Sequence, residues 1–308
     1  MNKNFKIFNS AVVIGPSGIG KAHLRELINF GIKKISVLGK KYKKDRLKIE
    51  KKKYKNVNFF NLKKIQEIKK FKPDIINICS PTKFHLNHIK LSKKISNRII
   101  VEKPLIWSKD KKNLNSSISK KLLNTNKIKI FVNFPMISLA NQLKKYENNK
   151  IKQLTFSYFT NGKNKHNDIG IDLLPHAFSF VLTLLNFRLS SFKIITVERK
   201  INSWNCKIQI KNCVCDFYFK QDIKKKFSEM KFSINENSYT REQYLKNGIY
   251  VNTLIKNNKK KIQIKNPMTD NLKYILKNID SKVALKKNNK ITIDSIKLTE
   301  KLINYKKI

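Results

Sequence analysis

Through the first half of the chain, short apolar runs alternate with longer segments in which apolar residues recur every three or four positions. The short runs predict buried strands, and the longer periodic segments predict helices between them. The predicted strands are residues 11–14, 34–38, 56–60, 75–79, 98–102 and 128–134. Strands separated by helices at this spacing form a parallel sheet with helices on both faces, so the predicted fold class is α/β with a doubly wound N-terminal sheet.

The second half has a different pattern. A long apolar segment at residues 170–185 predicts a buried helix, and Asn247-Gly248 predicts a hairpin turn. Runs that alternate with a period of two predict strands at residues 193–198, 207–211, 214–220, 231–235, 249–255 and 261–265. Two helices, near 268–278 and 293–305, are expected to close the chain. We therefore expect an α+β second domain with a mostly antiparallel sheet, and a boundary that gives domains 1–134 and 135–308.

The net charge of +48 changes this picture little. Such a charge can indicate binding to nucleic acid or to an acidic membrane surface. Here Lys is spread along the whole chain together with abundant Asn and Ile, whereas Arg, the better reader of bases, is scarce. This composition is typical of the codon bias of an AT-rich genome, so no nucleic-acid partner is expected. An anionic substrate remains a hypothesis that the charge favours.

The four cysteines do not form a metal motif. No C-x-x-C pair is present, and the C-x-C at Cys213 and Cys215 has no histidine nearby. His85 and His88 also lack a third ligand in sequence, so no metal site is expected. Reduced thiols, and the lack of a signal-peptide pattern, favour a cytoplasmic protein. The apolar segment 173–187 is interrupted by polar residues and too short to span a bilayer, so no membrane partner is expected.

A glycine-rich stretch follows the first predicted strand and precedes a predicted helix. Its sequence from Ala11 to His23 is AVVIGPSGIGKAH. A strand that turns sharply into a helix through glycines is typical of a nucleotide phosphate site, because backbone N–H groups at the helix start can contact phosphate. The P-loop template fits Gly15 to Lys21 but requires Ser or Thr where Ala22 stands. The dinucleotide template G-x-G-x-x-G fits Gly15 and Gly20 but has Ser17 in place of its second glycine.

The end of the second predicted strand bears on this choice. In an NAD site an Asp or Glu there would bind the ribose 2′-hydroxyl. This chain has Gly39-Lys40-Lys41 instead, which favours NADP over NAD, because cations suit a 2′-phosphate. The P-loop alternative requires a carboxylate at the end of an apolar strand to hold magnesium. Asp74 precedes its strand, which counts against that alternative.

Three further clusters carry candidate chemistry. Residues 80–85 (SPTKFH) follow the fourth predicted strand, and residues 102–105 (EKPL) follow the fifth. Ligands of an open α/β sheet bind outside the carboxyl ends of its strands, so both clusters are expected near a cofactor. In the apolar helix, Asp172 and His176 lie four residues apart and are expected on one face. Ionisable groups in so apolar a helix are costly unless they are partnered or functional.

With these motifs, the chain resembles the glucose-fructose oxidoreductase/inositol dehydrogenase (Gfo/Idh/MocA) family of NAD(P)-dependent oxidoreductases. The resemblance rests on four elements in order: G-x-x-H at 20–23, S-P-T-x-x-H at 80–85, E-K-P at 102–104 and D-x-x-x-H at 172–176. It implies a Rossmann dinucleotide-binding domain at 1–134. It also implies a substrate-binding and oligomerisation domain at 135–308 with an open sheet, and a homo-oligomer, either a dimer or a tetramer.

The resemblance also implies a reaction and a set of site residues. The reaction is hydride transfer between nicotinamide and a carbinol carbon of a sugar, polyol or nucleotide sugar, with NADP or NAD as cofactor. Lys103 would contact the nicotinamide ribose and the substrate hydroxyl, His176 would be the general acid/base, and Asp172 would orient the substrate or His176. The expected cofactor-binding residues are Gly15, Ser17, Gly18, Ile19, Gly20, Gly39, Lys40, Lys41, Ser80, Pro81, Thr82, His85, Glu102 and Lys103.

The sequence departs from the family pattern at three places. Ser17 replaces a glycine, Ser179 stands where relatives often have an acid, and residues 133–135 read Asn-Phe-Pro where relatives carry an arginine. Two alternatives therefore stay open beside the oxidoreductase. One is a catalytically weakened family member that binds nucleotide and acts as a regulator or partner. The other is a P-loop phosphotransferase.

Overall fold

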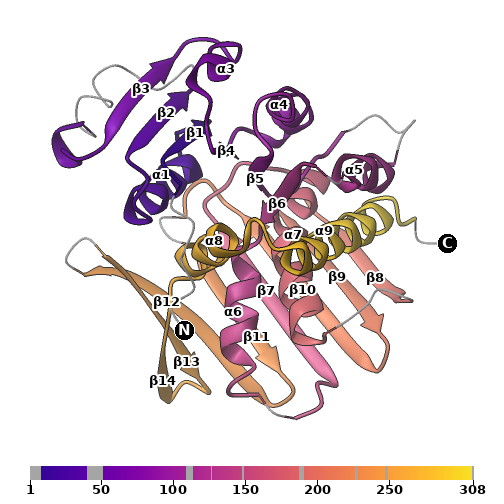
Figure 1. Ribbon diagram of the computed structural model, residues 1–308. Coiled ribbons are helices and arrows are strands. Elements are labelled where there is room, and N and C mark those ends of the chain that lie inside the picture. Colours follow the sequence, from indigo (N-terminus) through magenta and orange to yellow (C-terminus); the bar gives the residue numbers. More distant parts are fainter. Residues whose placement is uncertain are drawn as a thin grey trace. The chain divides into compact units, whose positions relative to one another are not determined.

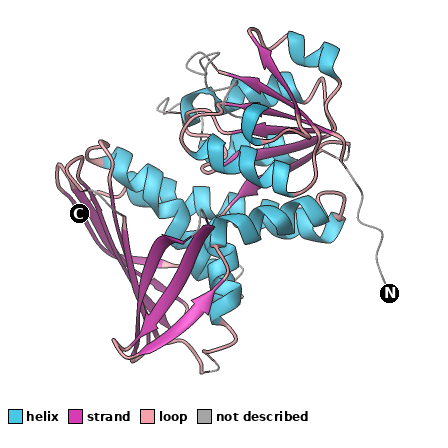
Figure 2. Ribbon diagram, turned by 90° about the vertical axis from the view of Figure 1, so that its left-hand side faces the viewer, coloured by secondary structure: helices cyan, strands magenta, loops and turns pink. Residues whose placement is uncertain are grey.

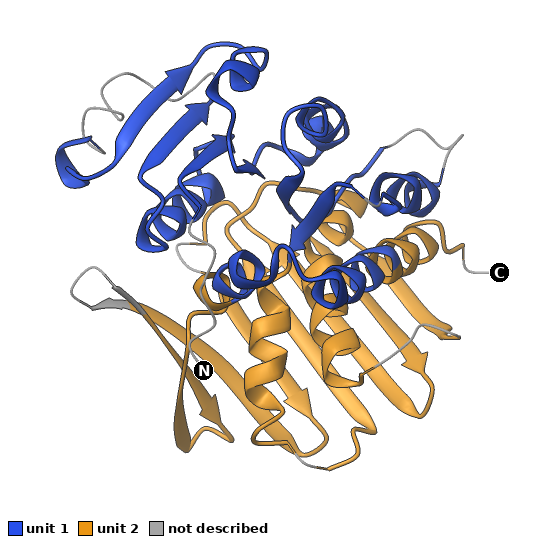
Figure 3. Ribbon diagram, viewed as in Figure 1, with its two compact units in different colours: residues 1–133, 271–293 blue, residues 134–270, 294–308 orange. Residues whose placement is uncertain are grey.

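The structure is a computed structural model (Figure 1) that describes residues 8–39, 51–108, 114–125, 127–147, 149–186, 191–225, 228–246 and 249–306. The chain forms two compact units (Figure 3). Unit 1 comprises Met1–Asn133 and Asn271–Ile293, and unit 2 comprises Phe134–Asp270 and Asp294–Ile308. The functional division into domains 1–134 and 135–308 stays a prediction.

Unit 1 contains a six-stranded parallel sheet in the order β3-β2-β1-β4-β5-β6. Its strands are β1 Ser10–Ile14, β2 Lys34–Leu38, β3 Asn58–Leu62, β4 Ile75–Ile78, β5 Arg98–Glu102 and β6 Lys129–Asn133. The central strands are buried on both faces, which is why their sequences are continuous apolar runs. This strand order is that of a dinucleotide-binding Rossmann sheet, and the predicted fold class is confirmed.

The sheet order reverses between β1 and β4, so their carboxyl ends border the topological switch point. Helices α1 (Ile19–Asn29) and α8 (Pro267–Asn278) contribute to one buried cluster with Ala11 and Val13 of β1. The remaining helices of unit 1 are α3 Glu67–Phe71, the 3-10 helix η1 Thr82–Phe84, α4 His85–Ser92, α5 Asn115–Leu123 and the first half of α9 (Lys282–Ile303).

Unit 2 contains an eight-stranded sheet in the order β14-β13-β12-β11-β7-β10-β9-β8. Its strands are β7 Gln153–Thr160, β8 Lys193–Arg199, β9 Ser203–Ile210, β10 Cys213–Gln221, β11 Glu229–Ile234, β12 Asn237–Lys246, β13 Ile249–Lys256 and β14 Lys260–Ile264. Neighbouring strands are antiparallel except β7 and β10, which are parallel. The expected α+β second half with a mostly antiparallel sheet is confirmed.

One face of this sheet is covered by α6 (Pro135–Leu143), α7 (Asn167–Leu184) and the second half of α9 (Figure 2). Residues of β7 alternate between this buried face, where Leu154 and Phe156 lie, and the opposite face. A Cβ at Gly170 of α7 would lie 3.1 Å from the Trp204 ring and 3.1 Å from the Ile303 side chain. The glycine therefore lets α7 approach β9 and α9 closely. This close packing determines where Asp172 and His176 of α7 lie relative to the sheet.

Several elements differ from the sequence-based prediction. The prediction missed β7, although its apolar residues alternate with polar ones, and it missed β12, whose sequence NSYTREQYLK contains few apolar residues. It also missed α6, which begins with Pro135 in the first turn, a position that suits proline because the N–H there has no helical partner. The last helix begins at Lys282, not at residue 293, because the polar residues 286–290 (KKNNK) separate its first apolar residues from the periodic segment on which the prediction relied. The predicted turn at Asn247-Gly248 lies outside the described residues, although β12 and β13 pair as expected for a hairpin.

Among the residues that the structure describes, no helix has both the length and the apolar character needed to cross a bilayer. The four cysteines are buried free thiols, and the sulfurs of Cys213 and Cys215 lie 3.7 Å apart.

Candidate functional site

The glycine-rich loop between β1 and α1 is built by close backbone contacts. Gly15 has φ +82°, a conformation that favours glycine, and a Cβ there would lie 2.7 Å from the backbone nitrogen of Ser80. A Cβ at Gly20 would lie 2.0 Å from the carbonyl oxygen of Gly15. Both positions thus exclude any side chain. The loops that follow β1 and β4 therefore touch at the switch point, where a doubly wound sheet binds its ligand.

The first turn of α1 follows this loop. None of the described side chains caps it by a hydrogen bond, and its first turn carries no acidic residue. Its N-terminal N–H groups and positive dipole end are therefore suited to an anion such as a pyrophosphate. Gly18 and Ile19 are exposed there, with 45% of Ile19 accessible, and Ser17 is partly buried. Gly39 follows β2 and lies beside Pro16, and the predicted Lys40 and Lys41 lie outside the described residues.

The loop after β4 is fastened to α4. The Ser80 hydroxyl lies 2.8 Å from His88 Nδ1, and Pro81 and Thr82 lead into η1. Beyond them, the exposed ring of Phe84 stacks against His88 with ring centroids 6.0 Å apart. Contacts with His88 thus hold the loop on both sides of Pro81 and Thr82. Between these contacts Pro81 is exposed and Thr82 is partly buried.

His85 joins the loop after β4 to the loop after β5. Its Nε2 lies 2.7 Å from the carbonyl oxygen of Ser80, and its Nδ1 lies 3.0 and 3.2 Å from those of Pro104 and Leu105. The ring is almost fully buried. Burial lowers the pKa of His85, and these carbonyl oxygens oppose that shift by favouring the protonated ring. Both ring nitrogens are used in joining the loops, so this histidine positions Ser80 and Pro104.

A buried polar network lies beside the glycine-rich loop. His23 of α1 is fully buried, with Nε2 2.6 Å from Glu102 Oε1 of β5 and Nδ1 3.0 Å from Asn77 Oδ1 of β4. Asn133 of β6 donates to the same Glu102 oxygen at 2.7 Å and accepts from Asn271 of α8 at 2.7 Å. The network thereby connects α1, the helix that follows the glycine-rich loop, with the strands β4, β5 and β6 and with α8.

The charges of this network reinforce each other. Burial alone would lower the pKa of His23, but the neighbouring Cys79 sulfur and the Glu102 carboxylate outweigh burial and raise that pKa to about 10. Burial would raise the pKa of Glu102, and the hydrogen bond and charge of His23 lower it instead. We therefore describe His23 and Glu102 as a buried ion pair. Its carboxylate immediately precedes Lys103, which is partly buried and is joined to Pro104 by a cis peptide bond.

In unit 2, Asp172 is held by two amides. Its Oδ2 accepts hydrogen bonds from Gln221 Nε2 at 2.9 Å and from Asn164 Nδ2 at 3.2 Å. The Asn164 backbone N–H in turn donates to Gln221 Oε1 at 3.0 Å. Gln221 is buried at the end of β10, so the carboxylate of α7 is fastened to the sheet and to the segment that precedes the helix.

His176 lies one helical turn after Asp172. Both are partly buried, whereas the α7 residues around them are mostly fully buried. The Tyr158 and His176 rings lie edge to face, with centroids 5.5 Å apart and an interplanar angle of 82°. The expected spacing on one helix face is therefore present, and an aromatic ring from β7 limits where the imidazole can lie.

Sequence reasoning missed a cluster that lies on the same sheet face beyond Tyr158. Arg241 of β12 donates from Nε to Asn252 Oδ1 at 3.2 Å and from Nη2 to Gln243 Oε1 at 3.0 Å. One signal in the sequence could have drawn attention to Arg241. Only six of the 68 Lys and Arg residues are Arg, so an arginine in a predicted sheet region is unusual for this chain.

The structure brings the predicted residues together in two groups. In unit 1, the glycine-rich loop, Ser80, His85 and Glu102 surround the switch point through the contacts above. In unit 2, Asp172 and His176 share a face of α7. Lys103 belongs to unit 1 and the other two catalytic candidates belong to unit 2, so their convergence stays a prediction.

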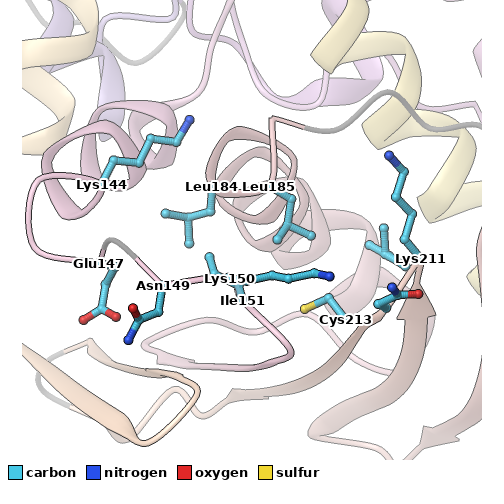
Figure 4. A pocket seen from close by; sticks show the side chains of 11 residues that line it. Lys144, Glu147, Asn149, Lys150, Ile151, Leu184, Leu185, Lys211 and Cys213 are labelled. Carbon is cyan, nitrogen blue, oxygen red and sulfur yellow. The ribbon is translucent and has the colours of Figure 1, made fainter.

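Two further observations concern ligands of other kinds. Among the described residues, no three His, Cys, Asp or Glu side chains gather as a metal-ligand set. A pocket of unit 2 lies near Leu184 and Leu185, at the opposite end of α7 from Asn167 (Figure 4). None of the residues lining it belongs to the predicted site, and Lys144 on its rim is bonded to Asn186.

Comparison with known proteins agrees with this geometry. Residues 9–113 match the family model described as "Oxidoreductase family, NAD-binding Rossmann fold" (GFO_IDH_MocA). No curated protein matches the chain in sequence.

Solved structures are similar over nearly the whole chain. A dehydrogenase (MviM) from Clostridium difficile has a TM-score of 0.67 at 17% identity, covering 98% of this chain and 99% of that one. The WlbA (WbpB) dehydrogenase from Thermus thermophilus, in complex with NAD and UDP-GlcNAcA, has a TM-score of 0.66 at 12% identity, covering 97% and 95%. A mutant of KijD10, a 3-ketoreductase from Actinomadura kijaniata in complex with TDP-benzene and NADP, has a TM-score of 0.68 at 10% identity, covering 95% and 96%.

At these identities the solved structures establish a shared fold. The family model adds a sequence match that spans the glycine-rich loop, the loop after β4 and the Glu102-Lys103-Pro104 element. The resemblance to the Gfo/Idh/MocA oxidoreductases is therefore confirmed, with residues 9–113 matching that family's NAD-binding Rossmann segment.

Proposed function

We propose that this protein is an NAD(P)-dependent oxidoreductase that acts on a CH–OH group of a sugar, polyol or nucleotide sugar. The observation that carries the proposal is the cradle at the switch point, where any side chain at Gly15 or Gly20 would collide with backbone. Such a loop before an uncapped helix fits the pyrophosphate of a dinucleotide. The family match over residues 9–113 supports the same cofactor.

The residues that would hold the dinucleotide come from three loops of unit 1. The glycine-rich loop and the start of α1 fit the pyrophosphate, and Ser80, Pro81 and Thr82 border the same switch point. When bound, the nicotinamide supplies the hydride acceptor or donor. Glu102 is committed to His23, so its part is to hold β5 and Lys103 in place.

The remaining residues handle the proton of the substrate hydroxyl. A hydroxyl must lose its proton when hydride leaves its carbon, and His176 is the general base that takes it, since the pKa of histidine lies near the operating pH. The Lys103 ammonium stabilises the developing alkoxide. Asp172, fixed by Gln221 and Asn164, orients the substrate or the imidazole.

Further parts of the proposal concern the cofactor and the assembly. Lys40 and Lys41, which follow β2, favour NADP because their charge suits a 2′-phosphate. The protein associates into a dimer or tetramer through the open face of the eight-stranded sheet, where Tyr218 is exposed and Lys207 pairs with Asp216. It works in the cytoplasm, in keeping with its four free thiols.

The nucleotide specificity tests this proposal against its alternatives. Fluorescence titrations with NADPH, NADH and magnesium-ATP are run on the wild type, on Gly20→Ala and on the surface control Lys94→Ala. We expect saturable NADPH binding that Gly20→Ala weakens at least tenfold and Lys94→Ala leaves unchanged. Binding of magnesium-ATP without binding of either reduced nicotinamide would overturn the proposal in favour of a P-loop phosphotransferase.

A further inference from the structure

Tyr158, Met230 and Arg241 form a row across three neighbouring strands. Tyr158 of β7 pairs with Met230 of β11, which pairs with Arg241 of β12. Two residues earlier on β7, Phe156 faces the helices as part of the buried core. Because side chains alternate along a strand, the row lies on the helix-covered face, which is also the face that α7 and His176 cover.

Arg241 is held differently from the other well-placed arginines. Arg98 makes a bidentate pair with Asp280, with N–O distances of 2.9 and 3.0 Å. Arg199 donates to the backbone carbonyls of Leu302 and Tyr305 at the end of α9. Among the residues that the structure describes, Arg241 donates hydrogen bonds to the neutral amides of Asn252 and Gln243 and pairs with no carboxylate.

This arrangement leaves a partly buried guanidinium without a counter-ion among the described residues. Burial lowers the pKa of Arg241, with Tyr158 opposing the shift, yet arginine stays charged at any physiological pH. Asn252 and Gln243 each accept one hydrogen bond, so they aim the guanidinium without neutralising it. Burying a charge without a counter-ion is costly, and such a cost is usual where a ligand supplies the opposite charge.

We propose that Arg241 is the receptor for an anionic group on the substrate, aimed by Asn252 and Gln243. This rests on the proposed oxidoreductase function and names its substrate class, a carbohydrate that carries a carboxylate or phosphate. Tyr158 and Arg241 are two strand spacings apart, about 10 Å between Cα atoms. With His176 against Tyr158, the anion therefore belongs to the sugar itself or to the first phosphate attached to it.

The chain is well suited to a direct test because it contains only six arginines. Uniform [15N]arginine labelling yields one Nε–H signal for each, and the signal lost in Arg241→Lys identifies Arg241. Full-length protein is titrated at constant ionic strength with inorganic phosphate, D-glucuronate, D-glucose 6-phosphate and D-glucose. The five signals that remain in Arg241→Lys, and in a second variant Arg241→Gln, report whether each variant keeps the wild-type fold.

We expect the Arg241 signal to shift saturably with phosphate and with at least one anionic sugar, while Arg98 and Arg199, which already have protein partners, stay in place. D-Glucose leaves all six signals unchanged. Tighter binding of D-glucuronate identifies a carboxylate, and tighter binding of D-glucose 6-phosphate identifies a phosphate. If the Arg241 signal moves no further than those of Arg98 and Arg199 with every anion, the receptor assignment is wrong.

A parallel NADPH titration of the same samples separates this result from the proposed function. Saturable NADPH binding with an unresponsive Arg241 overturns the anion receptor alone. A responsive Arg241 in a protein that binds no reduced nicotinamide overturns the oxidoreductase proposal and leaves an anion site on unit 2.

Discussion

His23 Nε2 lies 2.6 Å from Glu102 Oε1, and both side chains are buried beside the glycine-rich loop. This ion pair joins the helix that follows the loop to the strand that ends in Lys103. One contact thus positions both the start of α1, which would bind pyrophosphate, and Lys103, which would stabilise the alkoxide. The pair therefore links the loop that we propose binds the cofactor to the strand that carries the proposed catalytic residue Lys103.

Replacing one partner of this pair should be costly. Glu102→Gln leaves a buried imidazolium without its counter-ion, and we expect the free energy of unfolding to fall by about 3–5 kcal/mol. Urea denaturation measures the loss. The exposed Glu242→Gln is the matched control, with an expected change within about 0.5 kcal/mol. Equal effects of the two variants would contradict the buried ion pair.

The pair also predicts a pH dependence. The pKa of His23 is raised from 6.5 in the unfolded chain to about 10, so its contribution is complete below pH 6.5 and is lost as the pH rises toward 10. The pKa of Glu102 is lowered from 4.5, so its contribution is present above pH 4.5 and is lost as the pH falls through the folded value. Urea denaturation of wild type and His23→Gln at a series of pH values should show a stability difference that shrinks between pH 6.5 and 10. A difference that stays constant over this range would mean that His23 is neutral when folded.

The variant Gly20→Ala tests the proposed phosphate site by adding a side chain to the glycine-rich loop. A Cβ at this position meets the Gly15 carbonyl at 2.0 Å, so Gly20→Ala must displace the loop and should weaken NADPH binding at least tenfold. Gly31→Ala is the control for a glycine substitution outside the loop, because a Cβ there meets no atom within 4 Å, although the positive φ of Gly31 makes alanine costly to stability. Both variants should lose some stability, and only the first should lose cofactor affinity in a fluorescence titration. Similar NADPH affinities for the two would argue against a phosphate site at this loop.

Gln221 tests how Asp172 is positioned. Gln221→Ala removes the amide that donates to the Asp172 carboxylate at 2.9 Å and releases the backbone of Asn164. We expect kcat to fall about tenfold at unchanged NADPH affinity, because the Asp172 carboxylate is no longer held in its orientation. Gln209→Ala, on an exposed part of β9, should change neither. A kcat equal to that of the wild type, or equal losses of kcat and NADPH affinity, would mean that Gln221 does not position Asp172 for catalysis.

The sequence predicted those features of the site that depend on residues close together in the chain. The glycines, the strand ends that carry Ser80 and Glu102, and the spacing of Asp172 and His176 all lie within short segments whose pattern determines their geometry. The partners of these residues could not be predicted in the same way. Gln221 reaches Asp172 across 49 positions, and it does so only because β10 places its last residue beside α7.

The largest omission has the same cause. The prediction missed β7 and β12. It therefore also missed the row in which Met230 of β11 pairs with Tyr158 on one side and with Arg241 on the other. Strand register decides which side chains share a face, and a pattern of mixed polar and aromatic residues does not determine register. Arg241 in the sequence is one cation among many, and only the pairing of three strands shows that its neighbours are neutral amides.

Single-turnover hydride transfer tests the central claim most directly. Protein loaded with NADP+ is mixed with a panel of sugars, polyols and nucleotide sugars, and formation of the reduced cofactor is followed by its absorbance for the wild type, Lys103→Ala and Lys94→Ala. We predict that the wild type and Lys94→Ala reduce the cofactor with at least one compound, while Lys103→Ala binds the cofactor equally well and reduces it at least a hundredfold more slowly. Reduction at equal rates by the wild type and Lys103→Ala, or by neither with any compound, would contradict the account.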